Sequence, residues 1–248
     1  MPASASINRG EFVPAWQRAK DRLVKAFKLF VAERHYLLVR YERAHRRSWM
    51  DAVSRVKKER DLLLNHAEAC QLLAALTATA KVPGDIAEVG VAFGASAKLI
   101  AQYAGGRVLH LFDTFEGLPE TSAKDGERFQ AGQFQGTLED VQRYVGHNHV
   151  RYYKGLFPQT AGPVERTVFS FVHIDVDLYT STLSCLEFFY PRLAPGGILI
   201  SHDYLTAGGV DAAFQEFFAD KPEPVIELSG YQCMMVKTGG PHGQAPAV

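Results

Sequence analysis

Cysteine and long apolar runs are scarce in this chain of 248 residues. The three cysteines, Cys70, Cys185 and Cys233, are widely spaced and odd in number. This pattern favours buried free thiols in a reducing compartment over a disulfide framework or a catalytic cysteine. No run approaches the roughly 18 apolar residues of a membrane span, and no apolar stretch near Met1 resembles a signal peptide. We therefore expect a cytoplasmic, globular protein.

Net charge is also absent, because 27 Lys and Arg side chains balance 27 Asp and Glu side chains. The chain as a whole therefore has no electrostatic attraction for nucleic acid. The charge is unevenly distributed, since residues 1–60 hold 15 basic and 6 acidic side chains, whereas residues 61–248 hold 12 and 21. Such asymmetry indicates an arm or a partner-binding surface. We expect a basic helical arm over residues 1–60, a domain over 61–238 and a flexible tail over 239–248.

Glycine and proline are missing from residue 15 to residue 58, which predicts a long helix over 14–58. A second helix is predicted over 61–80, before a Pro-Gly pair. Apolar side chains recur in the first helix near helical spacing: Leu23, Phe27, Phe30, Val31, Leu38 and Tyr41. Packing of this stripe against a second copy would make the protein a homo-oligomer. Contact with an anionic membrane is the alternative.

Beyond Gly84 the sequence alternates between strand-like and helix-like segments. The expected strands span residues 86–91, 108–113, 150–155, 168–175, 196–203, 224–228 and 231–237. The expected helices span 96–104, 137–145, 181–193 and 209–220. This alternation predicts an α/β fold with a mostly parallel sheet and helices on both faces. Ligands of such sheets bind at the carboxyl ends of the strands.

The first expected strand ends in EVGVAFGAS, residues 88–96. Gly90 and Gly94 allow a ligand to approach the backbone, and the next helix offers free N–H groups to an anion. The second strand ends at Asp113, whose carboxylate can accept both hydroxyls of a ribose, and Glu88 can meet an ammonium group. Ribose, carboxylate and ammonium without pyrophosphate fit S-adenosylmethionine. The missing GxGxxG argues against a nicotinamide-dependent oxidoreductase.

Polar side chains also follow the fourth and fifth expected strands. Asp175 and Asp177 lie in HIDVDLYTST, and His202 and Asp203 lie in GGILISHDY. Neighbouring parallel strands are about 4.8 Å apart, so Asp175 and Asp203 can meet, and alternation directs Asp175 and Asp177 to the same side. A divalent cation between the acids would neutralise them and leave positions for substrate oxygens.

Six segments, in this order between residues 84 and 237, resemble the macrocin-type O-methyltransferases of antibiotic sugar modification: GDIAEVGVAFGAS, FDTFEGLP, GLFPQT, HIDVDLYTST, PGGILISHDY and QCMMVK. The resemblance implies a class I methyltransferase fold, with a seven-stranded sheet whose last strand is antiparallel. It implies S-adenosylmethionine and a divalent metal, usually magnesium, for methylation of a hydroxyl on a glycosylated small molecule. It also implies that the cofactor is held by Glu88, Gly90, Gly94, Ser96, Asp113 and Phe115, with Gly155 and Leu156 near its adenosine.

By the same resemblance, Asp175 and Asp203 bind the metal and Asp177 acts as the base. This chain departs from the family at His202, where the family has an aspartate. A histidine can ligate metal, but imidazole favours zinc, iron, manganese or nickel over magnesium. Alternatively, His202 is itself the base of a metal-independent methyltransferase acting on a phenol, a carboxylate or a peptide side chain. A histidine that is merely hydrogen-bonded at a strand end is the third interpretation.

The remaining expectations concern the walls of the site. Residues 120–136 are polar and contain glycine, which is typical of a lid, a substrate loop or an ordinary flexible loop. We interpret Tyr36, Tyr41, Trp49 and Arg55 as walls of an acceptor pocket, and Tyr179, Ser181 and Thr182 as residues that position a turn and cap a helix. A protein without turnover, with a cofactor-binding scaffold and a membrane- or partner-binding arm, is the alternative from another functional class.

Overall fold

The computed structural model describes residues 15–32, 43–146 and 148–239. The chain divides into two compact units, Met1–Ala44 and His45–Val248. In the smaller unit, α1 (Ala15–Ala32) exposes five large apolar side chains, which are Trp16, Leu23, Val24, Phe27 and Phe30. Leu38 and Tyr41 lie outside the described residues.

The helix predicted over residues 14–58 is not continuous. Arg43 forms a bend, and α2 (Ala44–Glu59) begins after it. The side chains of α2 that are buried recur at helical spacing, and they are Trp49, Ala52, Val53 and Val56. Burial of this face within the larger unit, rather than helix propensity alone, accounts for a separate α2. The predicted domain boundaries at residues 61 and 238 stay a prediction.

The next helix starts later than predicted, because Asn65 caps it. In α3 (His66–Ala78), the Asn65 side chain accepts hydrogen bonds from the backbone N–H groups of Ala67 and Glu68. The Glu68 carboxylate in turn accepts the Asn65 N–H at 2.7 Å. This reciprocal capping box satisfies N–H groups that the helix leaves free. Residues 61–64 consequently form a connection rather than a helical turn.

The larger unit is built on a seven-stranded sheet in the order β3-β2-β1-β4-β5-β7-β6. The strands are β1 (Asp85–Val89), β2 (Leu109–Asp113), β3 (Val150–Lys154), β4 (Phe169–Ile174), β5 (Leu193–Ser201), β6 (Ile226–Glu227) and β7 (Cys233–Val236). The first five are parallel, and β7 pairs antiparallel with both β5 and β6. The predicted α/β fold with an antiparallel last strand is confirmed.

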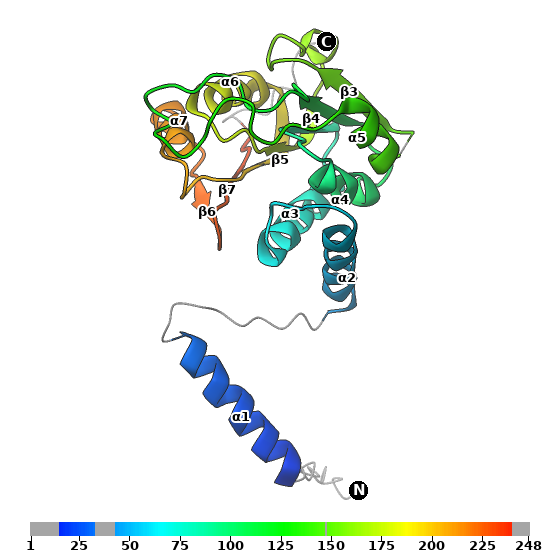
Figure 1. Ribbon diagram of the computed structural model, residues 1–248, viewed down its shortest axis with the longest axis vertical. Coiled ribbons are helices and arrows are strands. Elements are labelled where there is room, and N and C mark those ends of the chain that lie inside the picture. Colours follow the sequence, from blue (N-terminus) through cyan, green and yellow to red (C-terminus); the bar gives the residue numbers. More distant parts are fainter. Residues whose placement is uncertain (1–14, 33–42, 147, 240–248) are drawn as a thin grey trace, which may run out of the picture. The chain divides into compact units, whose positions relative to one another are not determined.

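Helices cover both faces of this sheet (Figure 1). The helices after β1 are α4 (Ala95–Tyr103), α5 (Leu138–Val145), α6 (Tyr179–Phe189) and α7 (Gly208–Phe218), with short 3₁₀ turns at Gly162–Val164 and Tyr190–Arg192. α3 and α4 lie on one face, and α6 and α7 on the other. Buried aromatic rings fill the α6 side, where Phe169 and Phe189 make an edge-to-face contact at 5.1 Å. Removal of this apolar surface from water stabilises the sheet that carries the site.

Two further expectations concern the cysteines and the membrane. All three cysteines are buried, and none of them forms a disulfide bond within the described residues, as predicted. None of the helices in the described ranges combines the length and the apolar character that crossing a bilayer requires.

Candidate active site

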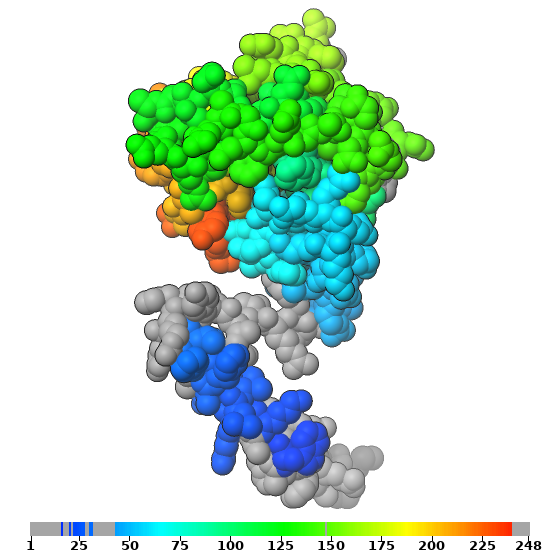
Figure 2. Space-filling model, in the orientation of Figure 1, coloured from blue at the N-terminus to red at the C-terminus, as the bar shows by residue number. Residues whose placement is uncertain are grey.

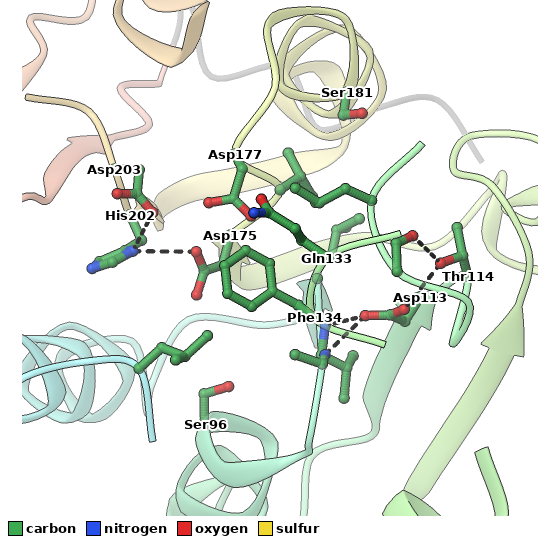
Figure 3. Close-up of a pocket in the computed structure, with 18 of the residues that line it drawn as sticks. Ser96, Asp113, Thr114, Gln133, Phe134, Asp175, Asp177, Ser181, His202 and Asp203 are labelled. Atoms are coloured by element: carbon green, nitrogen blue, oxygen red, sulfur yellow. Dashed lines mark hydrogen bonds and ion pairs between the residues drawn. The ribbon is translucent and has the colours of Figure 1, made fainter. Parts of the chain in front are cut away.

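A cavity of about 310 Å³ opens where β1, β2, β4 and β5 end (Figure 3). Its lining includes nine of the side chains or glycines predicted from the sequence: Gly90, Ser96, Asp113, Gly155, Leu156, Asp175, Asp177, His202 and Asp203. Glu88, Gly94 and Phe115 do not belong to its lining. The strand ends therefore bring the expected cofactor residues and the expected acids into one cavity.

The turn after β1 is shaped by Gly90 and Asp113. Gly90 has a φ of +87°, and a Cβ atom there would lie 1.7 Å from the carbonyl oxygen of Asp175. Only glycine fits this position. Asp113 accepts the N–H groups of Val91 and Ala92 at 2.7 and 2.9 Å, and the N–H of Phe115 at 2.6 Å. The Thr114 hydroxyl adds a longer contact with Asp113 Oδ1 at 3.5 Å. The Asp113 carboxylate thus fixes the turn through both of its oxygens.

Glu88 lies next to this turn but is fully buried. Its Oε1 is 2.9 Å from His173 Nδ1, and burial raises the pKa of the Glu88 carboxyl. Its Oε2 has no hydrogen-bond partner among the described residues. A buried acceptor of this kind is costly unless a donor satisfies it. The predicted contact of Glu88 with an ammonium group stays a prediction.

Three potential metal ligands converge on the other side of the cavity. Asp175, His202 and Asp203 each offer one ligand atom, and these atoms lie within 4.8 Å of one another. His202 Nδ1 is 2.8 Å from Asp203 Oδ2 and 3.3 Å from Asp175 Oδ1 (Figure 3). The strand β4 ends at Ile174, yet Asp175 and Asp177 both line the cavity. Two carboxylates and an imidazole are a donor set that divalent cations accept.

The electrostatics of this cluster require a positive charge. Burial lowers the pKa of His202, but the negative charge of Asp175 and hydrogen bonds to Asp175, Asp203 and Glu68 outweigh it and raise the pKa above its usual value. Burial likewise raises the pKa of Asp203, and the His202 hydrogen bond and charge outweigh it, so that the pKa is about 2. A proton on His202, together with the Arg128 guanidinium 3.7 Å from Asp203 Oδ1, therefore balances the acids. A divalent cation would supply positive charge in place of that proton, so the residues fit such an ion.

Asp177 differs from its neighbours. Burial, then the negative charges of Asp175 and Asp203, raise its pKa well above the ordinary value. A carboxyl with a raised pKa is a stronger proton acceptor than an ordinary aspartate once it is ionised. Its position beside the cluster suits a base that is not itself a ligand.

Backbone strain is concentrated around the cavity. Among the described residues, five that are not glycine have a positive φ: Ala92, Phe115, Phe134, Asp177 and Asp203. All but Phe115 line the cavity. Each such conformation costs of order 1–3 kcal/mol, and such residues cluster at active sites and ligand clamps. This strain is an indication of function that is independent of the sequence motifs.

Residues 120–136 form part of the wall, a role that the sequence leaves open. Arg128, Phe129, Gln133 and Phe134 line the cavity. Asp125 Oδ1 accepts the N–H of Tyr179 at 2.6 Å, and Arg128 donates to the Thr206 carbonyl at 3.1 Å. Figure 2 shows this segment, in green, on the outer surface of the larger unit. The segment is therefore tied to the elements that carry the acids.

The start of α6 corrects another expectation. The sequence predicts that Tyr179, Ser181 and Thr182 cap this helix, but its N-cap residue is Leu178, which makes no side-chain cap. Asp125 caps α6 from a segment 54 residues away. A local sequence pattern cannot predict a cap that depends on tertiary structure.

The wall on the amino-terminal side consists of Asp61, Leu62, Leu63 and Leu64. Trp49 and Arg55 do not line the cavity, because Trp49 is buried on the packed face of α2 and Arg55 is exposed. Tyr36 and Tyr41 lie outside the described residues. The apolar run directly before the Asn65 cap is the only sequence signal for this wall.

Comparisons with known proteins identify relatives of this chain. Residues 64–230 match the family model described as macrocin O-methyltransferase (TylF). A Streptomyces olivaceus protein, 8-demethyl-8-(2,3-dimethoxy-alpha-L-rhamnosyl)-tetracenomycin-C 4'-O-methyltransferase, is 33% identical over 140 residues, which are 50% of this chain and 54% of that protein. Demethyldecarbamoylnovobiocin O-methyltransferase from Streptomyces niveus is 28% identical over 155 residues, covering 56% and 59%.

These matches span little more than half the length of either curated relative. Among solved structures, the O-methyltransferase NovP aligns with a TM-score of 0.57 and 26% identity, over 68% of this chain and 77% of NovP. The family match covers the glycine turn, both acidic strand ends and the segment 120–136. The chain belongs to the macrocin O-methyltransferase family.

Proposed function

We propose that this chain is an S-adenosylmethionine-dependent O-methyltransferase that methylates a hydroxyl of a small molecule, a natural product or its sugar moiety, with the help of a divalent metal. One observation carries the proposal: the glycine turn after β1 and the acids after β4 and β5 line the same cavity. The relatives support the acceptor class, since the names of both describe O-methyltransferases of natural products.

In this proposal, the two sides of the cavity have different tasks. Gly90, Ser96 and Asp113 hold the cofactor, with Gly155 and Leu156 at its adenosine. S-adenosylmethionine supplies an electrophilic methyl group. The protein aligns this group with the acceptor oxygen, and alignment of bound reactants supplies much of the rate enhancement in such transfers.

On the acidic side, Asp175, His202 and Asp203 hold the divalent cation. That cation would act as a Lewis acid toward an acceptor oxygen. Asp177 removes the hydroxyl proton, since its buried carboxyl has a raised pKa and lies on the cavity. A positioned base contributes roughly 10²–10⁴-fold in rate. His202 is not the base in this proposal, because its imidazole is one of the three ligands of the cation.

The test uses radiolabelled S-adenosylmethionine with a panel of glycosides, catechols and modified peptides, each assayed with and without a chelator. We expect label on a glycoside hydroxyl, and loss of transfer in the chelator that added Mn²⁺ or Mg²⁺ restores. Transfer that is indifferent to chelator would remove the metal from the proposal. Calorimetry tests the cofactor separately, and S-adenosylmethionine binding weaker than millimolar would end the methyltransferase proposal.

A further inference from the structure

Glu68 is a buried carboxylate beside the cluster of Asp175, His202 and Asp203. It has no role in the proposed reaction. It lies in the first turn of α3 and is 1% exposed. Its Oε2 accepts the Asn65 N–H at 2.7 Å, and its Oε1 accepts the Tyr231 N–H at 3.0 Å. A Cβ at Gly230 would lie 2.4 Å from Oε1, so the adjoining chain leaves space only for glycine. The orientation of this carboxylate is thus fixed from two sides.

The fixed carboxylate faces His202. Glu68 Oε2 lies 3.5 Å from His202 Nε2, which is buried and makes no hydrogen bond of good geometry within the described chain. The other ring nitrogen, Nδ1, faces Asp203 at 2.8 Å and Asp175 at 3.3 Å. The imidazole of His202 therefore lies between one carboxylate on the α3 side and two on the cavity side.

The two ring nitrogens of a neutral imidazole are not equivalent, because one carries a proton and the other a lone pair. A nitrogen that ligates a metal must present its lone pair, and the other nitrogen then donates its proton to a carboxylate or carbonyl. In this protein only Nδ1 faces Asp175 and Asp203. A cation held by all three side chains consequently requires the proton on Nε2, where Glu68 is the nearest carboxylate.

We propose that Glu68 is a positioning residue that holds the Nε2 proton of His202, so that Nδ1 completes a mixed imidazole–carboxylate site that prefers Mn²⁺ or a similar transition metal to Mg²⁺. The inference rests on the metal site of the proposed function and adds the residue that organises it. Imidazole is a better ligand for transition metals than for Mg²⁺, which is best served by oxygen ligands alone. The contact between Glu68 and His202 thus allows an imidazole to serve as a metal ligand in this site.

The experiment measures Mn²⁺ and Mg²⁺ binding to the full-length protein, by calorimetry and by the electron paramagnetic resonance signal of free Mn²⁺, without cofactor or acceptor. E68Q keeps the size of the side chain but loses the charge, and its one amide oxygen can replace only one of the two oxygens that accept the Asn65 and Tyr231 N–H groups. We expect E68Q to weaken Mn²⁺ binding about 10–100-fold, the usual effect of removing such a partner. The wild-type protein should bind Mn²⁺ more tightly than Mg²⁺.

The matched control is D85N. Asp85 Oδ2 lies 2.9 Å from His110 Nε2, so these residues form a second carboxylate–imidazole pair. Asp85 is the first residue of β1, at the end of the strand away from the cavity. D85N should leave Mn²⁺ affinity unchanged. H202D removes the imidazole, so it should lower the preference for Mn²⁺ over Mg²⁺, and E68Q should cause no further loss of Mn²⁺ affinity in the H202D protein.

Equal Mn²⁺ affinity of E68Q and wild type would overturn the inference. It would also be overturned if E68Q lowered the Mn²⁺ affinity equally in the wild-type and the H202D protein. Failure of the wild type to bind Mn²⁺ would also overturn it. If E68Q does not fold, H202D alone decides, because an unchanged Mn²⁺-to-Mg²⁺ ratio contradicts the proposed role of the imidazole. A wild-type protein whose Mn²⁺ affinity depends on Glu68 and His202, but which transfers no methyl group, would refute the proposed function and leave this inference standing.

Discussion

Asp177 has a left-handed backbone, with a φ of +62°, at a position where its side chain reaches the cavity. Asparagine tolerates this conformation as well as aspartate does. We expect D177N to fold, to bind S-adenosylmethionine like the wild type, and to lower kcat by at least about 10²-fold, because the base is lost. Single-turnover methyl transfer, with cofactor affinity from calorimetry, makes the measurement. Wild-type turnover in D177N would exclude Asp177 as the base.

Gly90 offers a second prediction at the scale of single residues. In G90A the new methyl group would overlap the Asp175 carbonyl. Overpacking adds about 1–3 kcal/mol to the roughly 1–2 kcal/mol of a left-handed non-glycine residue. We expect G90A to lose about 3 kcal/mol or more of unfolding free energy in denaturant titrations.

The control for G90A is G106A. Gly106 has a similar φ of +84°, but a Cβ atom at this position would have no atom within 4 Å. G106A should therefore lose only the backbone contribution, about 1–2 kcal/mol. Equal losses in the two variants would show that the contact with Asp175 is unimportant.

The residues at the ends of β4 and β5 were predictable from the sequence, but the contact of Glu68 with His202 was not. Asp175, Asp177, His202 and Asp203 follow apolar strands, so parallel pairing brings them together. Glu68 lies in a helix that precedes the whole sheet in the chain, and nothing in its own segment indicates that α3 packs beside β5. The N-x-x-E pattern at Asn65 and Glu68 does predict a helix start, and it is the one local signal that points to this carboxylate.

At the scale of elements, residues 120–136 and α6 depend on Asp125. Its Oδ1 caps the Tyr179 N–H, and its Oδ2 accepts from the Ser122 N–H and hydroxyl. We expect D125A to cost about 0.5–2 kcal/mol, as other lost caps do. It should also raise KM for the acceptor and leave cofactor affinity unchanged, because the partners of Asp125 are Ser122 and Tyr179 and not the residues proposed to hold the cofactor. Steady-state kinetics with each substrate varied would test this.

S122A is the control for D125A, since it keeps the Asp125 bond to Tyr179. It should leave KM for the acceptor near the wild-type value. If S122A and D125A raised KM equally, the cap of α6 would not be the cause.

Glu223 provides a prediction of stability against pH. It is 3% exposed and accepts hydrogen bonds from Tyr190, Thr238 and, as an ion pair, Lys237. Burial raises its pKa, but the hydrogen bonds outweigh burial and bring the pKa from 4.5 to about 2. A carboxyl whose pKa is lowered by folding stabilises the protein above the unfolded-state pKa, and that contribution is lost as the pH falls toward the folded-state value.

We therefore expect E223Q to be less stable than the wild type at pH 7, by about 1–3 kcal/mol. The difference should shrink as the pH falls from 4.5 toward 2. Denaturant unfolding of both proteins at several pH values provides the measurement. A difference that stayed constant over this range would contradict the role of the ionised carboxylate.

The order of elements was predictable because strands and helices differ in periodicity, whereas their ends were decided by packing. The strand expected over 196–203 runs from Leu193 to Ser201, since β5 pairs with β4 from Leu193 onward. The prediction of one long amino-terminal helix was wrong at Arg43, which forms a bend. Absence of glycine and proline permits a helix but does not decide where one packing surface ends and the next begins.

At the scale of the whole molecule, the division between Ala44 and His45 predicts how the chain tolerates truncation. A chain that starts at Ala44 keeps α2 and should unfold at the same temperature as the intact larger unit, with unchanged cofactor affinity. A chain that starts at Arg60 loses the buried side chains of α2, among which Val53 and Val56 are each worth about 1.5–3 kcal/mol when fully buried.

Thermal unfolding and calorimetry of the two truncated proteins compare the predicted boundary at residue 60 with the structural division at residue 44. Equal stability of both would show that α2 is dispensable. Sedimentation of the longer truncated protein also tests the oligomer prediction, because loss of association would assign it to the first 43 residues.

The bond between Asp125 and the first residue of α6 has a consequence for engineering. Residues 120–136, which form part of the cavity wall, are fastened to the helix that directly follows Asp177. A segment that is grafted from a relative to change substrate preference must therefore carry an aspartate at the position of Asp125. Without it, the graft will move Asp177, the proposed base, together with the cavity wall. Swaps that respect this join should exchange selectivity while turnover survives.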